Sequence, residues 1–309
     1  MKPFQTLATF VLTLSMVGSC RTADPEPQRG EPYELVWSDE FNEDGPLDSV
    51  DWGYERGFVR NRELQWYQPE NAVCKDGYLV IEARREQKPN PKFDPAKELP
   101  AGRNSDRGWR NRRTIEYTSA SVNTRGKREW TYGRFEIRAK IDVRDGSWPA
   151  FWTLGVAGPW PANGEIDIME YYDDTLLFNV AWAGIPTPPD RSTTWNTKRI
   201  PLASLPKDWA DEFHTWRMDW TPDAIKLYLD DVLMNEQDLS ETLNRDPLPA
   251  GAPRNPFHRP VYLLLNQAIG GMHGGDPSAT EFPVRYLIDY VRVWQIPGQL
   301  DVPAQAITP

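Results

Sequence analysis

The sequence is poor in cysteine and histidine: its 309 residues include two cysteines and three histidines. Three scattered histidines cannot build a metal cluster, and no HExxH, CxxC or glycine-rich phosphate-binding pattern is present. Basic residues are outnumbered as well, with 35 Lys and Arg against 45 Asp and Glu and a formal net charge of −10. Such a chain lacks the basic face that nucleic-acid phosphates require, which excludes nucleic acid but not neutral sugars as partners.

Long apolar runs are absent apart from one at the N-terminus, FQTLATFVLTLSMVG, which follows Lys2 and is too short for a comfortable membrane span. The run ends in VGSC, where small residues lead into Cys20. This pattern resembles a bacterial lipobox, in which the cysteine is lipidated and becomes the new N-terminus. An ordinary secretory signal with an incidental cysteine is the alternative. We favour a signal peptide over residues 1–20 with lipidation at Cys20, because Cys74 then has no partner for an intrachain disulfide.

The rest of the chain reads as one folded domain between two polar ends. Residues 21–33 are rich in proline and too poor in apolar side chains to fold, which predicts a flexible tether. Residues 34–296 suffice for one large β domain, and residues 297–309 form a tail without periodicity. We expect a monomer at the bacterial cell envelope, on the outer membrane or cell surface, that meets the membrane through the lipid anchor alone. Without lipidation the protein would be secreted.

Period-two hydrophobic patterns dominate the domain. In RFEIRAKI, residues 134–141, apolar and charged side chains alternate without a fault. Asp76-Gly77 and Asp230-Asp231 each separate two strand-like runs and predict tight hairpins. The best helix candidate, PKDWADEFHTW, is short. Many strands with little helix predict an all-β fold, an antiparallel β-sandwich of the jelly-roll type with a concave substrate cleft.

Two long segments separate these strands, residues 86–111 and 183–196. Long ordered loops in compact domains are often functional, so both are candidates for the walls of a groove. Disordered surface insertions are the alternative.

The stretch GEIDIMEYY, residues 164–172, carries three acids that shape the functional hypothesis. In a regular strand Glu165 and Asp167 point to one face and Glu170 to the other, where it would enter a hydrophobic layer at high cost. A β-bulge near Ile168-Met169 resets the alternation and brings all three acids to the open face. Bulges are common beside active sites, so the pattern predicts a catalytic strand.

Two carboxyl groups on one face suit a retaining glycosidase, which places a nucleophile and an acid/base about 5–5.5 Å apart. An Asp between them can hydrogen-bond the nucleophile, and the negative charges of Glu165 and Asp167 should raise the pKa of Glu170, with a rate optimum on the acidic side of neutral. A solvated acidic strand face and a calcium site are the alternatives.

The segment GSWPAFWTLG supports the glycosidase reading. On a strand, Trp148, Ala150 and Trp152 share one face, with the two indoles about 13 Å apart, and Phe151 takes the other. Core packing is the commoner use of such a pair. Because this pair of tryptophans lies beside three acids, we interpret it as a platform for successive sugar rings.

These motifs together resemble glycoside hydrolase family 16, and within it the bacterial laminarinase-like endo-β-glucanases. GEIDIMEYY is similar to the family's active-site signature in its bulged form. The similarity runs in consistent order from about residue 35 to 295, through VWSDEFN, RNRELQWYQPENAV, DGYLVIEARRE, YTSASVNT, YGRFEIRAKI, WPAFWTLG, FHTWRMDW, LLLNQAIGG and DYVRVW.

The resemblance implies a role for each matching residue. It makes Glu165 the nucleophile, Asp167 the assisting carboxylate and Glu170 the acid/base. Trp148 and Trp152 would stack on sugars, and Asn71 would hydrogen-bond the substrate. No cofactor is implied for catalysis.

The family also often holds a structural calcium on the convex side, and the matching positions here are Glu40, Gly77 and Asp289. Asp289 as a simple solvent-facing strand residue is the alternative.

Three positions depart from the family pattern or match it without a catalytic role. FNVAWAG stands where many laminarinases have a histidine, so Trp182 or Asn179 would line that region. Gln267, in NQAIGG, replaces a residue that is usually apolar and is a further candidate for substrate contact. His214 matches the pattern, and we interpret it as structural.

The sequence thus predicts an endo-acting retaining hydrolase of β-1,3- or mixed β-1,3/1,4-glucan. The same mechanism on galactose-containing chains such as agar, porphyran or mucin glycans is one alternative. A non-catalytic glycan-binding lipoprotein is the other, although such a protein has no need for both Glu165 and Glu170.

Overall fold

The computed structural model describes residues 32–98, 108–185 and 193–298. The chain divides into two units, Met1–Pro32 and Tyr33–Pro309, and every element below belongs to the second. Cys20, the predicted signal peptide and nearly all of the tether lie outside the described residues. In the described ranges, no helix has the length and apolar character needed to cross a membrane.

The smaller of two β-sheets has seven antiparallel strands. In spatial order they are β12 (Thr194–Pro201), β11 (Thr175–Trp182), β10 (Glu165–Tyr172), β9 (Ser147–Gly155), β16 (Val261–Ile269), β7 (Ser121–Asn123) and β2 (Gly53–Tyr54).

The larger sheet has ten strands. Its main path is β15 (Val232–Asp238), β14 (Ala224–Leu229), β13 (His214–Trp220), β8 (Gly133–Lys140), β17 (Val284–Gln295), β5 (Tyr78–Pro89), β6 (Thr114–Ser119) and β3 (Gln65–Tyr67). Beside it, β1 (Glu34–Asp39) pairs with β17 and β4 (Ala72–Lys75) with β5, and one pair, β3 with β6, is parallel.

Helix in the described residues is limited to single 3₁₀ turns: η1 (Pro69–Asn71), η2 (Pro95–Lys97), η3 (Leu202–Ser204), η4 (Trp209–Asp211), η5 (Leu239–Glu241) and η6 (Pro256–His258). The predicted helix around PKDWADEFHTW is η4 alone, because the period-two pattern of β13 takes over at His214. The all-β jelly-roll prediction is confirmed.

Both predicted hairpins are present. Asp76 (φ 55°) and Gly77 (φ 81°) join β4 to β5, and Asp230 (φ 46°) and Asp231 (φ 64°) join β14 to β15. Two-residue turns with positive φ match the right-handed twist of the flanking strands, and Asp tolerates this conformation better than most side chains. The turns therefore determine the pairing at the start of each hairpin, and the β14–β15 register shifts by one residue between Tyr228 and Leu227.

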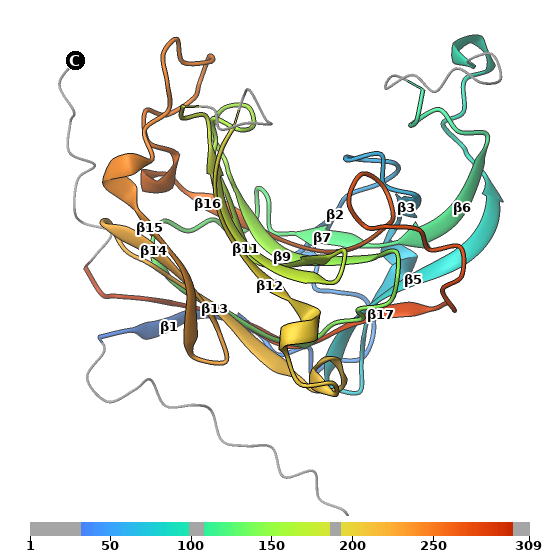
Figure 1. Ribbon diagram of the computed structural model, residues 1–309, viewed down its shortest axis with the longest axis horizontal. Helices are drawn as coiled ribbons and strands as arrows, with labels where there is room; N and C mark the ends of the chain where they lie inside the picture. Colours follow the sequence, from blue (N-terminus) through green and yellow to red (C-terminus); the bar gives the residue numbers. More distant parts are fainter. Residues whose placement is uncertain (1–31, 99–107, 186–192, 299–309) are drawn as a thin grey trace, which may run out of the picture. The chain divides into compact units, whose positions relative to one another are not determined.

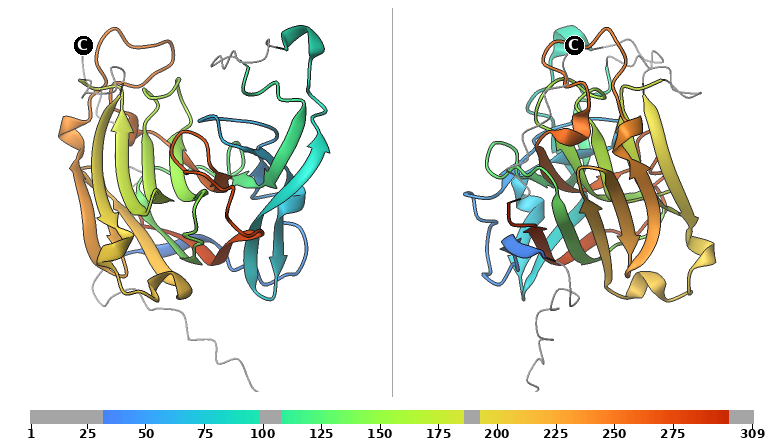
Figure 2. Two further views of the ribbon diagram at one scale, coloured as in Figure 1. Left: turned by 45° about the vertical axis from the view of Figure 1, so that its right-hand side comes forward. Right: turned by 90° about the vertical axis from the view of Figure 1, so that its left-hand side faces the viewer.

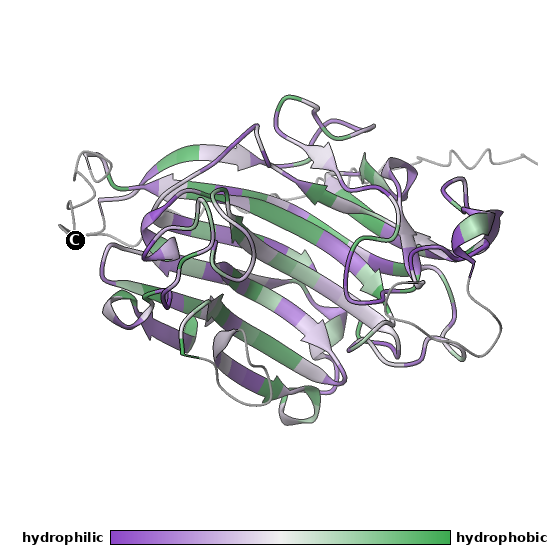
Figure 3. Cartoon of the chain, turned by 90° about the horizontal axis from the view of Figure 1, so that it is seen from above, coloured by the Kyte–Doolittle hydropathy of each residue, from purple (hydrophilic) through white to green (hydrophobic). Residues whose placement is uncertain are grey.

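The main core lies between the sheets. Strand β8 contributes Phe135, Ile137 and Ala139 to it, as its alternation predicted, and β10 contributes Ile166 and Ile168. Each of these side chains is fully buried. Hydrophobic and hydrophilic bands alternate along the strands seen from above (Figure 3). The face of the smaller sheet that is free of this core carries a separate apolar cluster, made of Ala150, Trp152, Tyr262 and Leu264.

The smaller sheet is curved, and its free face lies on the inside of the bend (Figure 1). At one end the β5–β6 hairpin rises beside this face, with η2 near its tip (Figures 1 and 2). Strand β5 continues to Pro89, so the predicted 86–111 loop begins later than expected. Arg112 donates to the carbonyls of Arg62, Glu63 and Leu64 at 3.3–3.4 Å, which fastens the hairpin to the loop before β3.

Candidate active site

A β-bulge in β10 places the three acids on one face. Asp167 lies opposite Trp152 of β9, but the next pair is Met169 with Phe151, so β10 contains one extra residue. The β11 side shows the same shift between Asp167 and Glu170. Ile168 and Met169 are both fully buried. The predicted bulge is confirmed, and Glu170 does not enter the hydrophobic layer.

A bridging amide ties two of the acids together. Asn179 Nδ2 donates to Asp167 Oδ2 at 2.9 Å and to Glu170 Oε2 at 3.0 Å. The other carboxylate oxygen of Glu170 accepts from Trp148 Nε1 at 2.8 Å. Hydrogen bonds to both oxygens fix the orientation of Glu170, which a general acid requires.

Glu165 has a different neighbour. Trp160 Nε1 donates to Glu165 Oε2 at 3.0 Å, and the positive charge of Arg60 favours its ionised form. The two glutamates therefore share a face but are oriented by separate tryptophans, as two groups with different roles should be.

Burial dominates the electrostatics of the site. It raises the pKa of Glu165 to about 8, with a further increase from the charge of Glu170. It also raises the pKa of Glu170 to about 8, with a further increase from Asp167. The pKa of Asp167, which is 5% exposed, is raised well above its usual value by burial and then by Glu165. The three acids therefore do not all ionise at neutral pH, and at Glu165 the Trp160 hydrogen bond and the charge of Arg60 oppose the rise in pKa.

From the sequence alone, the charges of Glu165 and Asp167 are expected to raise the pKa of Glu170, with a rate optimum below neutral pH. Burial is the larger cause. The loss of activity at high pH is therefore expected near pH 8.

Comparison with known proteins identifies the family of this site. The sequence profile of glycosyl hydrolases family 16 matches residues 66–263 of the chain. The chain belongs to glycosyl hydrolase family 16. It is a glycosidase, and family 16 glycosidases need no cofactor for catalysis.

Three similar proteins illustrate the range of the family. A β-glucanase of Rhodothermus marinus is 37% identical over 306 residues, which cover 94% of this chain and 93% of that protein. The catalytic domain of an endo-1,3-β-glucanase (laminarinase) from Thermotoga petrophila is 33% identical with a TM-score of 0.67, covering 86% of this chain and 98% of its own. A protein from the human gut microbiota, whose endo-acting O-glycanases initiate mucin breakdown, is also 33% identical, with a TM-score of 0.75, covering 90% and 96%.

The tryptophans predicted as a sugar platform lie on the acid face but expose little surface. Trp148 is 5% and Trp152 is 7% exposed. Trp152 Nε1 donates to Asn266 Oδ1 at 2.8 Å, and the Arg60 guanidinium lies 5.1 Å from its ring centroid. In this structure both indoles orient site groups, and the stacking role stays a prediction.

Two of the residues predicted to contact substrate, Trp182 and Gln267, point away from the acids. Asn179 and Ala181 lie on the acid face of β11, whereas Trp182 belongs to the main core and packs against Phe257. The prediction for Trp182 is wrong because strand side chains alternate, so that only one of the neighbouring pair reaches the acids.

Gln267 is fully buried, and its amide donates to Ser147 Oγ and to the Ala268 carbonyl, each at 3.0 Å. It lies on the core-facing side of β16, with Leu263 and Leu265 of the main core at the preceding alternate positions. The prediction for Gln267 is therefore also wrong. Its neighbour Asn266 reaches the acid face through Trp152, and the sequence reading missed it.

Asn71 does not join the acid cluster either. It is 1% exposed, and its Nδ2 donates to the Glu82 carbonyl at 2.7 Å and to Thr118 Oγ1 at 3.1 Å. This arrangement leaves no surface for a sugar hydroxyl, and it makes Asn71 a link between η1 and strands β5 and β6.

The expected calcium positions lie on the larger sheet, after β1, in the β4–β5 turn and in β17. Arg292 donates to both carboxylate oxygens of Glu40 at 2.9 Å, and Arg138 donates to Asp289 at 2.6 Å. No cluster of three acidic, histidine or cysteine side chains fit to hold a metal occurs in the part of the chain that the structure describes. Separate arginines hold the carboxylates of Glu40 and Asp289, and Gly77 has only a backbone carbonyl to offer a cation.

His214 has a structural role, as expected. Its ring stacks on Trp209 with centroids 4.1 Å apart, Nδ1 contacts Asp230 Oδ2 at 2.6 Å, and Nε2 contacts the Trp209 carbonyl at 2.8 Å. It ties the β14–β15 turn to η4 on the larger sheet, away from the acid strand.

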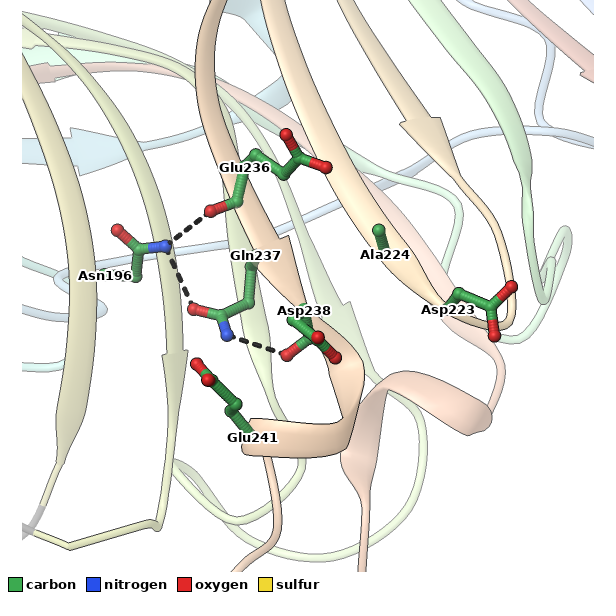
Figure 4. A pocket seen from close by; sticks show the side chains of 7 residues that line it. All are labelled: Asn196, Asp223, Ala224, Glu236, Gln237, Asp238 and Glu241. Atoms are coloured by element: carbon green, nitrogen blue, oxygen red, sulfur yellow. Dashed lines mark hydrogen bonds between the residues drawn. The ribbon is translucent and has the colours of Figure 1, made fainter.

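A hollow of about 500 Å³ opens where the edge strands β12 and β15 approach each other (Figure 4). Asn196 Nδ2 donates there to the Glu236 carbonyl and to Gln237 Oε1, each at 2.9 Å. Acidic side chains line much of the remainder: Asp223, Glu236, Asp238 and Glu241. The side chain of Asn196 projects from the face of β12 opposite to the acid face, so this hollow takes no part in the active site.

Proposed function

We propose that this protein is an endo-acting, retaining β-glucanase that cleaves β-1,3- or mixed β-1,3/1,4-glucan. One observation carries the proposal: the bulge in β10 brings Glu165 and Glu170 to the same face, with a separate tryptophan N–H bound to each. The similarity to a β-glucanase and a laminarinase supports the choice of glucan.

In this mechanism the Glu165 carboxylate attacks the anomeric carbon and forms a glycosyl ester while the bond to the leaving oxygen breaks. Glu170 gives its proton to that oxygen. Water then loses a proton to Glu170 and attacks the same carbon, the ester bond breaks, and Glu165 returns as a carboxylate with the configuration retained. Asp167, linked to Glu170 through Asn179, helps keep Glu170 protonated until the leaving oxygen arrives.

A panel of polysaccharides tests the substrate. Incubation with laminarin, lichenan, agarose and mucin glycans, followed by product sizing, should yield short oligosaccharides from the glucans. NMR of fresh product should show the β-anomer. An initial α-anomer would rule out the retaining mechanism together with the roles of both glutamates.

Galactose-containing chains are the second candidate. The TM-score of 0.75 to the gut-microbiota protein exceeds the 0.67 to the laminarinase at the same 33% identity. The same acids serve either substrate, so this candidate predicts cleavage of mucin glycans or agarose in the same panel while both glucans stay intact.

We propose further that Cys20 carries a lipid that holds the protein at the cell envelope as a monomer. The support is the VGSC sequence after an apolar run, and Cys74 is buried and free, so it needs no partner. Mass spectrometry of the mature N-terminus tests this, because an unmodified start downstream of Cys20 contradicts the anchor.

We infer that any calcium bound near Glu40, Gly77 and Asp289 would serve stability alone. These positions belong to the larger sheet, whereas the acids belong to the smaller one. A cation there cannot contact the reacting sugar.

A further inference from the structure

The exposed aromatic surface beside the acids comes from residues outside the predicted platform. Trp160 is 47% exposed, compared with 5% for Trp148 and 7% for Trp152. Its indole N–H is bound to Glu165, so the exposed ring stands next to the proposed nucleophile. A large apolar ring left in water beside a catalytic carboxylate calls for a partner.

The strand register places a second tryptophan in the same row. Glu165 lies opposite Ala181 of β11, and Ala181 lies opposite Trp195 of β12. Residues directly opposite in antiparallel strands share a face, so Trp195 is on the acid face, two strand spacings or about 10 Å from Glu165. The Trp160 and Trp195 rings are 6.5 Å apart at an interplanar angle of 52°. Ala181 between them has no side chain beyond its methyl group, which leaves the surface between Glu165 and Trp195 low.

Polar side chains that can donate hydrogen bonds follow Trp195 on the same face of β12. Thr197 lies opposite Asn179, and Arg199 lies opposite Leu177, which is itself opposite Glu170. Arg199 is exposed, and its charge lowers the pKa of Glu170, in keeping with a position beside the acid/base. Strand β12 is the last of its sheet, so this row ends the acid face on that side.

We propose that Trp160 and Trp195 bind one sugar ring of the substrate chain on the β12 side of the cleavage point, with Thr197 and Arg199 beside its hydroxyls. The apolar face of a hexose packs on an indole, while its rim of hydroxyls needs donors and acceptors at the edge. The row from Glu165 to Trp195 crosses the strands and gives a glycan a continuous path away from the nucleophile. The inference rests on the proposed function in that the ligand is a polysaccharide.

Substitution of Trp195 tests the site without touching the acids. Loss of the ring in Trp195→Ala should raise KM for laminarin or laminarihexaose about tenfold, the equivalent of one aromatic contact, with kcat within about twofold. Trp195→Phe should retain most of the affinity. Lys198→Ala, on the opposite face of β12, is the matched control and should match the wild type. An aryl glycoside of a single sugar should be cleaved equally by all four proteins.

Binding is measured directly by calorimetric titration of laminarihexaose into Glu165→Gln and into Glu165→Gln with Trp195→Ala. Unchanged affinity and KM in the Trp195→Ala proteins would overturn the proposal. So would an equal loss in Trp195→Phe and Trp195→Ala accompanied by a lower Tm and slower aryl glycoside cleavage, since that pattern belongs to a structural residue. If the wild type cleaves neither laminarin nor lichenan, only the proposed substrate is wrong. The variants are then compared on the polysaccharide that the wild type does cleave.

Discussion

At the scale of single residues, the two glutamates differ in their partners more than in their pKa. Glu165 accepts from Trp160, whereas Glu170 accepts from Trp148 and Asn179. Both carry a pKa of about 8 because burial disfavours their charges. Their different roles therefore depend on where each carboxyl group lies relative to the bound sugar.

Removal of the acid/base should spare one kind of substrate. Glu170→Ala should lose polysaccharide cleavage, yet still form the glycosyl ester from an aryl glycoside whose leaving group needs no proton. Azide should then restore turnover and give a glycosyl azide of retained configuration, because an anion needs no base to attack the ester. The product is identified by NMR, and Glu165→Ala with azide serves as the contrast. An azide product of inverted configuration from Glu170→Ala would exchange the two assignments.

Burial of the acids should also cost stability at high pH. The pKa of Glu165 rises from 4.5 to about 8 on folding, so the folded state binds protons more tightly and stability falls as pH rises between these values. Glu165→Gln should therefore have a higher Tm than the wild type at pH 8.5 and about the same Tm at pH 4. Glu34→Gln, at an exposed position, is the control and should show no such pH-dependent gain. A Tm for Glu165→Gln at or below that of the wild type at pH 8.5 would contradict the pKa argument.

At the scale of secondary-structure elements, the bulge and the hairpins determine which side chains meet. Because of the bulge, the side chain of Glu170 points to the face that residue 169 would take in a regular strand. Deletion of Met169 should remove the bulge and still leave the glutamate on the acid face, because the registers with β9 and β11 then become regular. We expect this variant to fold and to keep laminarin hydrolysis within about 10²-fold of the wild type, a cost typical of a small misplacement.

The control deletes both Ile168 and Met169. It shifts the glutamate by one more position, onto the core face, and should abolish activity. Equal activity in the single and double deletions would show that strand register does not aim Glu170.

The β14–β15 hairpin should respond to pH through His214. Burial lowers the pKa of His214, but the Asp230 hydrogen bond and the Trp209 carbonyl raise it more, to a value above 6.5. Its contribution is therefore complete below pH 6.5 and lost as pH rises through the folded-state pKa. His214→Gln should cost about 1–2 kcal/mol at pH 6 in denaturant unfolding, and less at pH 9. A constant difference between pH 5 and 9 would show that the charge is irrelevant.

At the scale of the whole molecule, the two sheets divide the work. The smaller sheet carries the acids, while the larger sheet carries the arginine pairs of Glu40 and Asp289. Treatment with EDTA should therefore leave the initial rate on laminarin unchanged at temperatures well below Tm, and any effect should be on Tm. A rate that falls with EDTA and returns with calcium, at constant Tm, would place the cation in the active site.

The sequence by itself determined the elements and the chemistry. Alternation of apolar and charged residues fixed β8, Asp76-Gly77 and Asp230-Asp231 fixed two turns, and the cost of burying Glu170 required the bulge. These are local effects, carried by residues within a few positions of each other, so they can be read without coordinates.

Only the tertiary structure decided what surrounds the acids. Trp152 is covered by Arg60 and Asn266, and Trp148 packs against Tyr172 and His273, all of which come from other segments of the chain. Trp182 and Gln267 looked equivalent to their neighbours until the pairing of β11 and β16 assigned their faces. Trp195 lies thirty residues from Glu165 in the chain and enters the site only because β12 pairs with β11. Contacts between strands that are distant in the sequence depend on which strands become neighbours. The buried pattern restricts the register of a pair, because a shift by one residue reverses every side chain, but it does not choose the partner strand.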